Sequence, residues 1–215
     1  MTNPKVATLL RRYGRTYAEE AGIRLADRPA PLYQLLVLAT LLSARINAGV
    51  AVAAARELFH AGYRSPAAMG DASWQDRVDA LGRGHYRRYD ERTATMLGDG
   101  AELLAGKWHG DLRKLRDDAS GDASGIASRL TEFPGVGPTG ASIFLREVQE
   151  VWPGVAPYVD AKVTSGAHRV RLPADRESLG GLLAASGQPA RLAAALVRVS
   201  LSQRAASEVT ASVRD

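Results

Sequence analysis

The six residues Phe-Pro-Gly-Val-Gly-Pro at 133–138 constrain the fold of this chain more than any other segment. A helix that precedes them must stop at Phe133, because Pro134 cannot continue it. Pro138 suits the first position of a second helix, which we expect over about 139–148. The segment therefore predicts two helices joined by a tight turn.

Two glycines in this turn, Gly135 and Gly137, permit a positive φ and carry no side chain, so another backbone can approach closely. Free amides and the positive end of a helix dipole would then be exposed, and together they form a phosphate site that needs no basic side chain. An ordinary helix–helix turn is the alternative, and a lone Gly-x-Gly would favour it. The complete Pro-Gly-Val-Gly-Pro string between two apolar helices favours phosphate binding.

Helical spacing of apolar residues recurs along the rest of the chain, whereas few segments alternate with the period of a strand. Aromatic residues make up only 6% of the sequence, and Ala and Leu, which are strong helix formers, dominate the apolar set. Helices are predicted at about 4–21, 31–44, 49–61, 85–105, 124–132 and 189–207, with Ser65 and Ser73 as caps of further helices. The predicted fold class is all-α.

Composition excludes several classes of site. The chain has no cysteine, so it has no disulfide, no thiolate zinc site and no cysteine-ligated iron–sulfur cluster. The longest uncharged stretch, 29–44, is too short to span a membrane, and residues 1–15 lack the apolar core of a signal peptide. A cytoplasmic protein is expected. The formal charge of +5 and the pI near 9.7 suit a polyanionic partner.

Four ordered landmarks resemble the helix-hairpin-helix (HhH-GPD) superfamily of DNA glycosylases, especially its endonuclease III-like branch. They are Leu-Leu-Ser-Ala-Arg at 41–45, the hairpin at 130–141, the Pro/Gly-containing loop at 152–158 and Val-Asp-Ala-Lys-Val at 159–163. The resemblance covers about 32–171. It implies a two-lobed helical fold with one helix-hairpin-helix motif and an interlobe cleft. The helical barrel lobe would be 29–151, and a second lobe would combine 1–28 with 152–215.

The resemblance also implies which residues contact the partner, double-stranded DNA containing a damaged or mismatched base. The candidate DNA-binding residues are Gly135, Val136, Gly137, Thr139, Gly140 and Arg45. Arg45 replaces the glutamine with which relatives fill the gap left by a flipped base, although a surface arginine at a helix end is an equal alternative. A monovalent cation on the backbone carbonyls of Thr131, Phe133 and Val136 is implied by the resemblance alone.

Asp160 matches the family's essential aspartate. Cleavage of an N-glycosidic bond builds positive charge on the sugar, which an anion stabilises, and a carboxylate can also orient or deprotonate the attacking water. The base must first be flipped out of the stack. An aspartate before Ala-Lys-Val-Thr is equally a good helix N-cap, and in the family the residue does both.

The hairpin departs from the bifunctional members at Thr139, where they carry the lysine that forms a Schiff base with the sugar. Lyase activity by that route is therefore not expected. Lys162 is the nearest substitute amine, although a solvated lysine or a phosphate contact is the favoured interpretation. Monofunctional relatives lack the lysine and hydrolyse with water and the aspartate, and some relatives lack the iron–sulfur cluster.

A basic and aromatic cluster lies at 83–92, with Arg83, His85, Arg87, Arg88 and Arg92 interleaved with Tyr86 and Tyr89. Such groups neutralise phosphates and stack on bases, but the exposed face of an ordinary helix is the favoured interpretation. The four histidines show no metal-ligand spacing. His168, eight residues after Asp160, is expected on a helix surface.

These observations lead to a base-excision repair hypothesis: a monofunctional DNA N-glycosylase, a hydrolase without lysine-dependent lyase activity, that is monomeric and nucleoid-associated in the cytoplasm. The alternative is a catalytically inactive DNA-binding protein on the same fold, which recognises damage or structure. A third hypothesis, a helical interaction protein that does not bind DNA, would leave the hairpin as a simple turn.

Overall fold

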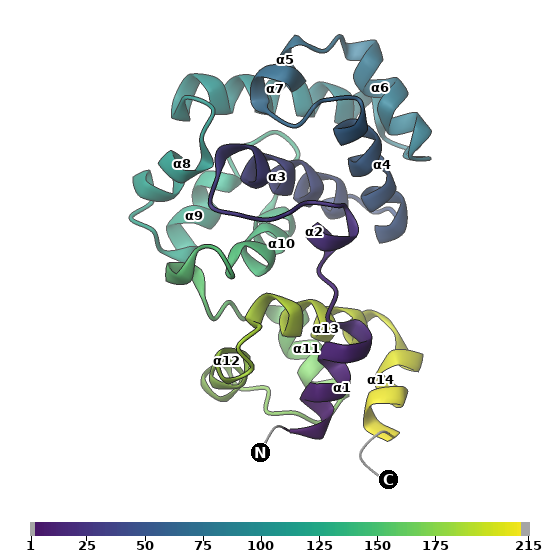
Figure 1. Ribbon diagram of the computed structural model, residues 1–215, viewed down its shortest axis with the longest axis vertical. Coiled ribbons are helices and arrows are strands. Elements are labelled where there is room, and N and C mark those ends of the chain that lie inside the picture. The colour runs from purple at the N-terminus through teal and green to yellow at the C-terminus, as the bar shows by residue number, and fades with distance from the viewer. Residues whose placement is uncertain (1–2, 212–215) are drawn as a thin grey trace. The chain divides into compact units, whose positions relative to one another are not determined.

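The computed structural model describes residues 3–211, and over that range the chain is all-α, as predicted. No strand occurs among these residues (Figure 1). The helices are α1 (Pro4–Tyr13), α2 (Tyr17–Glu20), α3 (Pro29–Ser43), α4 (Ala48–His60), α5 (Pro66–Asp71), α6 (Trp74–Arg83), α7 (Asp90–Trp108), α8 (Leu112–Asp118), α9 (Ala123–Leu130), α10 (Pro138–Val148), the 3-10 helix η1 (Pro153–Val155), α11 (Ala161–Arg169), α12 (Arg176–Ala185), α13 (Pro189–Leu201) and α14 (Gln203–Ala211).

The chain divides into two compact units. Unit 1 combines both ends of the sequence, Met1–Tyr17 and Arg146–Asp215, and unit 2 is Ala18–Leu145. The boundary on the C-terminal side falls within α10. Within the part of the chain that the structure describes, no helix is both long enough and apolar enough to cross a lipid bilayer.

Unit 2 is organised around α3, which Figure 1 shows in the middle of this unit. Nine of its residues are buried, from Leu32 to Leu41, and they cover all sides of the helix. A helix that is apolar all round must be enclosed by other elements, and α3 packs on α4 and α8. The sequence predicted this central position. The N-terminal prolines at Pro29 and Pro31 fit the first turn, because amides there have no intrahelical acceptor.

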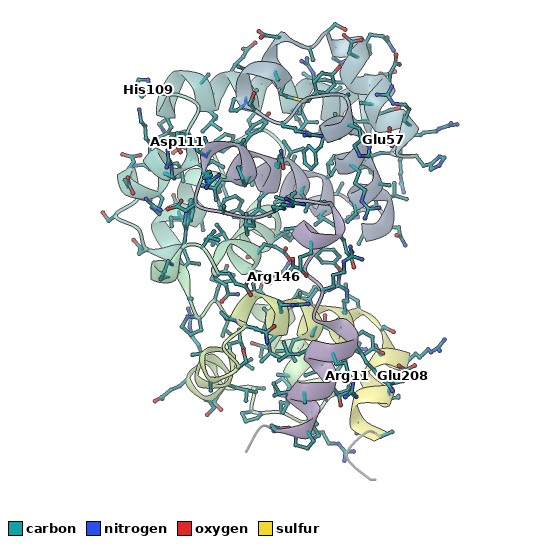
Figure 2. All side chains as sticks on the ribbon, viewed as in Figure 1. Arg11, Glu57, His109, Asp111, Arg146 and Glu208 are labelled. Carbon is teal, nitrogen blue, oxygen red and sulfur yellow. The ribbon has the colours of Figure 1, made fainter. Side chains whose placement is uncertain are left out.

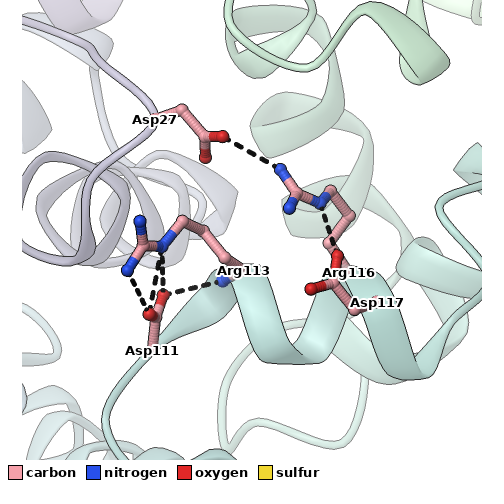
Figure 3. A network of polar contacts seen from close by, with 5 residues as sticks. All are labelled: Asp27, Asp111, Arg113, Arg116 and Asp117. Carbon is pink, nitrogen blue, oxygen red and sulfur yellow. Dashed lines mark hydrogen bonds and ion pairs between the residues drawn. The ribbon is translucent and has the colours of Figure 1, made fainter.

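Charged side chains fasten the loops of unit 2. Arg77 of α6 is buried and donates to the carbonyls of Met69, Ala72 and Ala94, so it satisfies three carbonyl groups between α5 and α7. Arg116 of α8 lies 3.1 Å from the carboxylate of Asp27 (Figure 3). This ion pair connects the segment before α3 to α8.

Unit 1 is built on the pair α11 and α13, which pack closely. Gly166 makes this possible, because a Cβ at that position would overlap the backbone carbonyl of Leu196. The first helix, α1, packs on α13 and α14, and in Figure 1 the purple α1 lies beside these yellow-green and yellow helices. The Tyr13 hydroxyl donates to Glu208 at 2.6 Å. The unit therefore depends on both ends of the described chain.

Three helices that the sequence predicted as continuous are shorter or divided. The helix predicted at 4–21 ends at Tyr13, because the next residue, Gly14, returns its amide to Leu10 and closes the helix. The one predicted at 85–105 begins only at Asp90. The last, predicted at 189–207, is interrupted at Ser202, whose extended backbone separates α13 from α14.

Candidate functional site

The turn of the hairpin, residues 131–137, has the geometry that the sequence predicted. Helix α9 ends at Leu130, and two backbone bonds form the turn: Phe133 N–H donates to Leu130 at 3.2 Å and Val136 N–H to Phe133 at 3.0 Å. Helix α10 then begins at Pro138, which has no N–H to satisfy. The result is a helix–turn–helix in which the second helix presents its N-terminus at the turn.

The two hairpin glycines have different roles. Gly135 adopts a φ of +80°, and a Cβ there would lie 2.7 Å from Met96 Sδ. Gly137 has no positive φ, and a Cβ there would meet nothing within 4 Å. Gly135 is therefore required by the turn itself. Gly137 is not required by the packing of the unbound protein, and a side chain there would occupy open space in front of α10.

Some residues of the turn and of the start of α10 are buried and others are exposed. Phe133 and Val136 are buried, and the ring of Phe133 stacks on Trp108 with centroids 5.6 Å apart. Gly137 and Thr139 are exposed. The first four amides of a helix have no intrahelical acceptor. The exposed turn therefore offers backbone N–H groups at the positive end of the α10 dipole, which suits an anion.

The end of α3 lies directly against this hairpin. Ser43 Oγ is 3.3 Å from the carbonyl of Gly135, and a Cβ on Gly140 would be 3.4 Å from Ser43 Cβ. Two residues later, Arg45 is exposed, and no hydrogen bond or ion pair connects it to the described residues. The fold of unit 2 therefore brings together two of the sequence landmarks, 41–45 and the hairpin.

The nearby carboxylate is already neutralised. Glu132, at the start of the hairpin, forms ion pairs with Lys107 and with Arg129, the latter at 3.2 Å. The Lys107 ammonium, followed by the Arg129 guanidinium, holds the pKa of Glu132 below its ordinary value. The Glu132 carboxylate consequently offers little uncompensated negative charge to oppose an anion at the hairpin.

The basic and aromatic cluster spans the end of α6, the loop that follows it and the first turn of α7, all in unit 2. Tyr86 is buried, and Gly84 approaches α4 so closely that a Cβ would overlap Ala54. Arg87 in this anchored loop and Arg92 in the first turn of α7 are exposed, without a carboxylate partner among residues 3–211. Other members are engaged: Arg83 pairs with Glu57 at 3.3 Å, and the Arg88 guanidinium lies 5.2 Å from the ring centroid of Tyr89. His85, with a φ of 64°, is also exposed.

Asp160 of unit 1 is the N-cap of α11. Its Oδ1 accepts the amides of Lys162 at 2.9 Å and Val163 at 3.0 Å. Its Oδ2 accepts from the Arg146 guanidinium at 2.8 Å. The two side chains of this ion pair are only 10% and 12% exposed, with Arg146 the less exposed. Both carboxylate oxygens are thus engaged, and an arginine balances the negative charge.

Arg146, which Figure 2 labels near the end of α10, was not among the residues that the sequence singled out. Its carbonyl accepts from Gln149 Nε2 at 2.8 Å, and Gln149 Oε1 accepts the amide of Tyr158 at 3.0 Å. This chain of bonds fixes the loop that leads to Asp160. The sequence did contain a signal for this ion pair. Arg146 and Glu147 follow three consecutive apolar residues that are buried in α10, and charged side chains are rarely buried unless they are paired.

Thr139, Lys162 and His168 are exposed, whereas Gly140, predicted to bind DNA, is buried. Lys162 is in the first turn of α11, with its amide bonded to Asp160 and no side-chain partner among the described residues. His168 lies on the exposed surface of α11, as predicted. Thr139 belongs to unit 2 and Lys162 to unit 1.

No protein-family model matches this chain, and no curated protein matches it. Among solved structures, the chain is similar to a protein in the structure of a trapped endonuclease III–DNA covalent intermediate in an estranged-adenine complex. The two are 18% identical, the match covers 92% of this chain and 85% of that chain, and the TM-score is 0.48. A likeness of this size assigns neither a family nor an activity.

Proposed function

We propose that this chain binds double-stranded DNA through the hairpin. The observation that carries the proposal is the exposed N-terminus of α10, with Gly137 open in front of it. Backbone amides and a helix dipole bind a phosphate without regard to sequence. Arg45 adds an uncompensated positive charge close to the hairpin, and Arg87 and Arg92 add two more in the same unit.

We further propose that the protein is a monofunctional DNA glycosylase in which Asp160 promotes hydrolysis. The support is the ordered set of sequence motifs that resembles the endonuclease III-like branch, together with the N-cap geometry of Asp160. This proposal includes the division into a helical barrel lobe at 29–151 and a second lobe made of 1–28 and 152–215. The proposal also includes a monovalent cation bound by the backbone carbonyls of the hairpin. One of these carbonyls, that of Phe133, already accepts a hydrogen bond from the Val136 amide.

In this reaction the oxygen of a water molecule bonds to the sugar C1′ as the bond from C1′ to the base breaks. The base leaves with the electron pair of that bond and takes a proton from solvent, while Asp160 accepts a proton from the water. Thr139 supplies no amine, so no Schiff base forms and the strand stays intact. Oδ2 accepts only the one bond from the Arg146 guanidinium, so its second lone pair is the acceptor for that proton.

A catalytically inactive DNA-binding protein is the second candidate, and the Arg146–Asp160 ion pair favours it. An aspartate whose charge is balanced stabilises a developing cation less than a free one does. Asp111 shows that this chain uses the same arrangement structurally, because it caps α8 and pairs with Arg113 at 2.7 Å (Figure 3).

The two candidates separate in an assay on duplexes that each carry one damaged or mismatched base. Free base and alkali-labile sites are scored apart from direct strand cleavage, for the natural chain and for Asp160→Asn, which keeps a good N-cap. The glycosylase proposal expects base release without strand cleavage, reduced by about 10²–10⁴-fold in Asp160→Asn. Asp111→Asn is the matched control and should release base normally.

Three other outcomes are informative. DNA binding without base release from any duplex supports the inactive candidate. A protein–DNA adduct trapped by borohydride and lost in Lys162→Met contradicts the monofunctional mechanism and assigns the amine to Lys162. Absence of any duplex binding contradicts both candidates.

A further inference from the structure

Unit 1 contains a surface pocket that the proposed function does not use. Its volume is about 320 Å³. The pocket lies where the end of α11 and the turn after it meet α14. It is lined by Arg169, Arg171, Gln203, Ala206, Ser207, Thr210 and Ala211.

One face of α14 forms a wall of the pocket. The lining positions 203, 206, 207, 210 and 211 recur with the spacing of a single helix face. These side chains are small or polar, so they leave room instead of filling it. Ser207 contributes a hydroxyl, and Thr210 donates its own hydroxyl hydrogen to the Ala206 carbonyl at 2.8 Å, which leaves its oxygen as an acceptor.

The charge inside the pocket is positive, and no carboxylate of the described residues lines the pocket to balance it. Arg171 has no side-chain partner among the described residues, and Arg169 has only Gln203, at 3.5 Å. The acid on this helix, Glu208, is bound to Tyr13, Arg12 and Arg204. Those contacts keep its carboxylate out of the pocket lining.

Helix electrostatics account for one of the arginines but not for the other. Arg169 is in the last turn of α11, where a cation complements the negative end of the dipole. Arg171 lies beyond that helix with a φ of +54°, and its carbonyl accepts from Lys5 Nζ at 3.1 Å. The turn therefore presents the Arg171 guanidinium at the pocket, with a third cation close to its backbone.

We propose that this pocket binds a phosphate ester. Guanidinium groups are the side chains best suited to phosphate oxygens, and hydroxyl and amide groups complete the recognition of an attached polar group. A volume of about 320 Å³ is larger than a lone phosphate needs, so a sugar-sized group fits as well. The ester can come from a nucleotide unit within DNA or from a free phosphorylated small molecule.

The test uses the full chain labelled with ¹⁵N. Inorganic phosphate and a deoxynucleoside 5′-monophosphate are titrated at constant ionic strength, with sulfate-free buffer, while the amide signals of α14 are followed. We expect saturable shifts centred on Ser207 and Thr210. Arg171→Met and Arg169→Met should each weaken binding of the monophosphate about 10-fold, because each removes a cation from the pocket.

Arg204→Met is the matched control. It removes an arginine from the same helix, but one that pairs with Glu208 and does not line the pocket. Its affinity for the monophosphate should equal that of the natural chain. Ser207→Asp, which places an acid in the pocket, should abolish binding even if an arginine variant folds poorly. Absence of saturable shifts, or equal affinity in all four variants, would overturn the proposal.

A second arm distinguishes the source of the ester. If it belongs to DNA, Arg171→Met also weakens binding to a 20-base-pair duplex and lowers the salt dependence by about one ion. If it belongs to a free molecule, only monophosphate binding changes. Either result supports the pocket. The proposed function is tested separately by Gly137→Val, so failure of the pocket leaves the hairpin proposal intact.

Discussion

The hairpin and the Asp160 site differ in whether their polar groups already have partners within the protein. At the hairpin, the buried side chains Phe133 and Val136 hold the turn, while residues Gly137 and Thr139 stay exposed. At Asp160, each carboxylate oxygen already has a partner, and the arginine of the pair is 90% covered. The hairpin can therefore accept an anion without rearrangement. Asp160 already has its charge balanced by Arg146, so it would attract a developing cation less strongly than a free carboxylate does.

The proposed binding site and the proposed catalytic residue therefore differ in how readily they can contact another molecule. A group with no partner can bind at once, whereas a group with a nearly buried partner costs free energy to release.

Arg146→Met should have the largest effect. It leaves the Asp160 carboxylate nearly buried without its counter-ion, and breaking a fully buried pair typically costs 3–5 kcal/mol. Because about a tenth of each side chain is exposed, we expect a loss of about 2–4 kcal/mol in the free energy of unfolding. Urea denaturation measures it. The double variant with Asp160→Asn should recover most of the loss, and no recovery would mean that the pair is not the cause.

Gly135→Ala should destabilise unit 2 by about 1–3 kcal/mol, because an L-residue is strained at a φ of +80° and its Cβ would press on Met96. The thermal melt is the measurement. A variant as stable as the natural chain would show that the hairpin does not need this backbone conformation.

Gly137→Val should instead leave folding nearly intact, at a cost of no more than about 1 kcal/mol from weaker N-capping of α10. We expect it to lower the affinity for duplex DNA about tenfold, which corresponds to about 1.4 kcal/mol. Fluorescence anisotropy with a labelled duplex measures the change. Equal affinity for the two proteins would contradict DNA binding at the hairpin.

Arg45→Met should reduce DNA affinity by a smaller factor, about two- to fivefold, because it removes one exposed cation and no backbone contact. The slope of log K against log salt should fall in magnitude by about one. Arg83→Met serves as the control, since that arginine is paired with Glu57. A full-sized salt slope in Arg45→Met would remove this arginine from the interface.

Asp111 sharpens the comparison through pH, with the smallest effect. Hydrogen bonding to the Arg113 guanidinium holds the pKa of Asp111 below its ordinary value. A carboxyl with a depressed folded pKa stabilises the protein above its unfolded pKa, near 3.9, and this contribution is lost as the pH falls through the folded value. Asp111→Asn should therefore make the stability of unit 2 less dependent on pH below about 4. An unchanged acid transition would contradict it.

Most of the helices and the hairpin could be predicted from the sequence because their signals are local. Prolines, caps and apolar spacing act within a few residues of one another, so Pro138 and Ser73 began helices where expected. The loop at 84–89 could not be predicted in this way, because it depends on Tyr86 entering the core and on the contact of Gly84 with α4. Helical propensity alone predicted that the helix at 85–105 would include this loop.

The candidate site was predictable in its parts but not in its pairings. The N-cap at Asp160 follows from the residues immediately after it. Its ion pair with Arg146 joins positions 14 residues apart across η1, and nothing local specifies which acid a buried arginine meets. Arg171 was missed for a similar reason, since its role depends on α14, a helix that the sequence merged with α13.

The assembly of unit 1 from both ends of the chain has a consequence for synthesis. Arg198 of α13 donates to the carbonyl of Tyr13, which is 185 residues earlier. Ribosomes add about 5–20 residues per second, so α1 waits roughly 10–40 seconds for the helix that covers it. During that time its apolar residues Val6 and Leu9 have no core to enter, and unit 2 is completed before α13 is made. The nascent chain should therefore pass through a stage in which unit 2 is folded while α1 is still uncovered and accessible to chaperones and proteases.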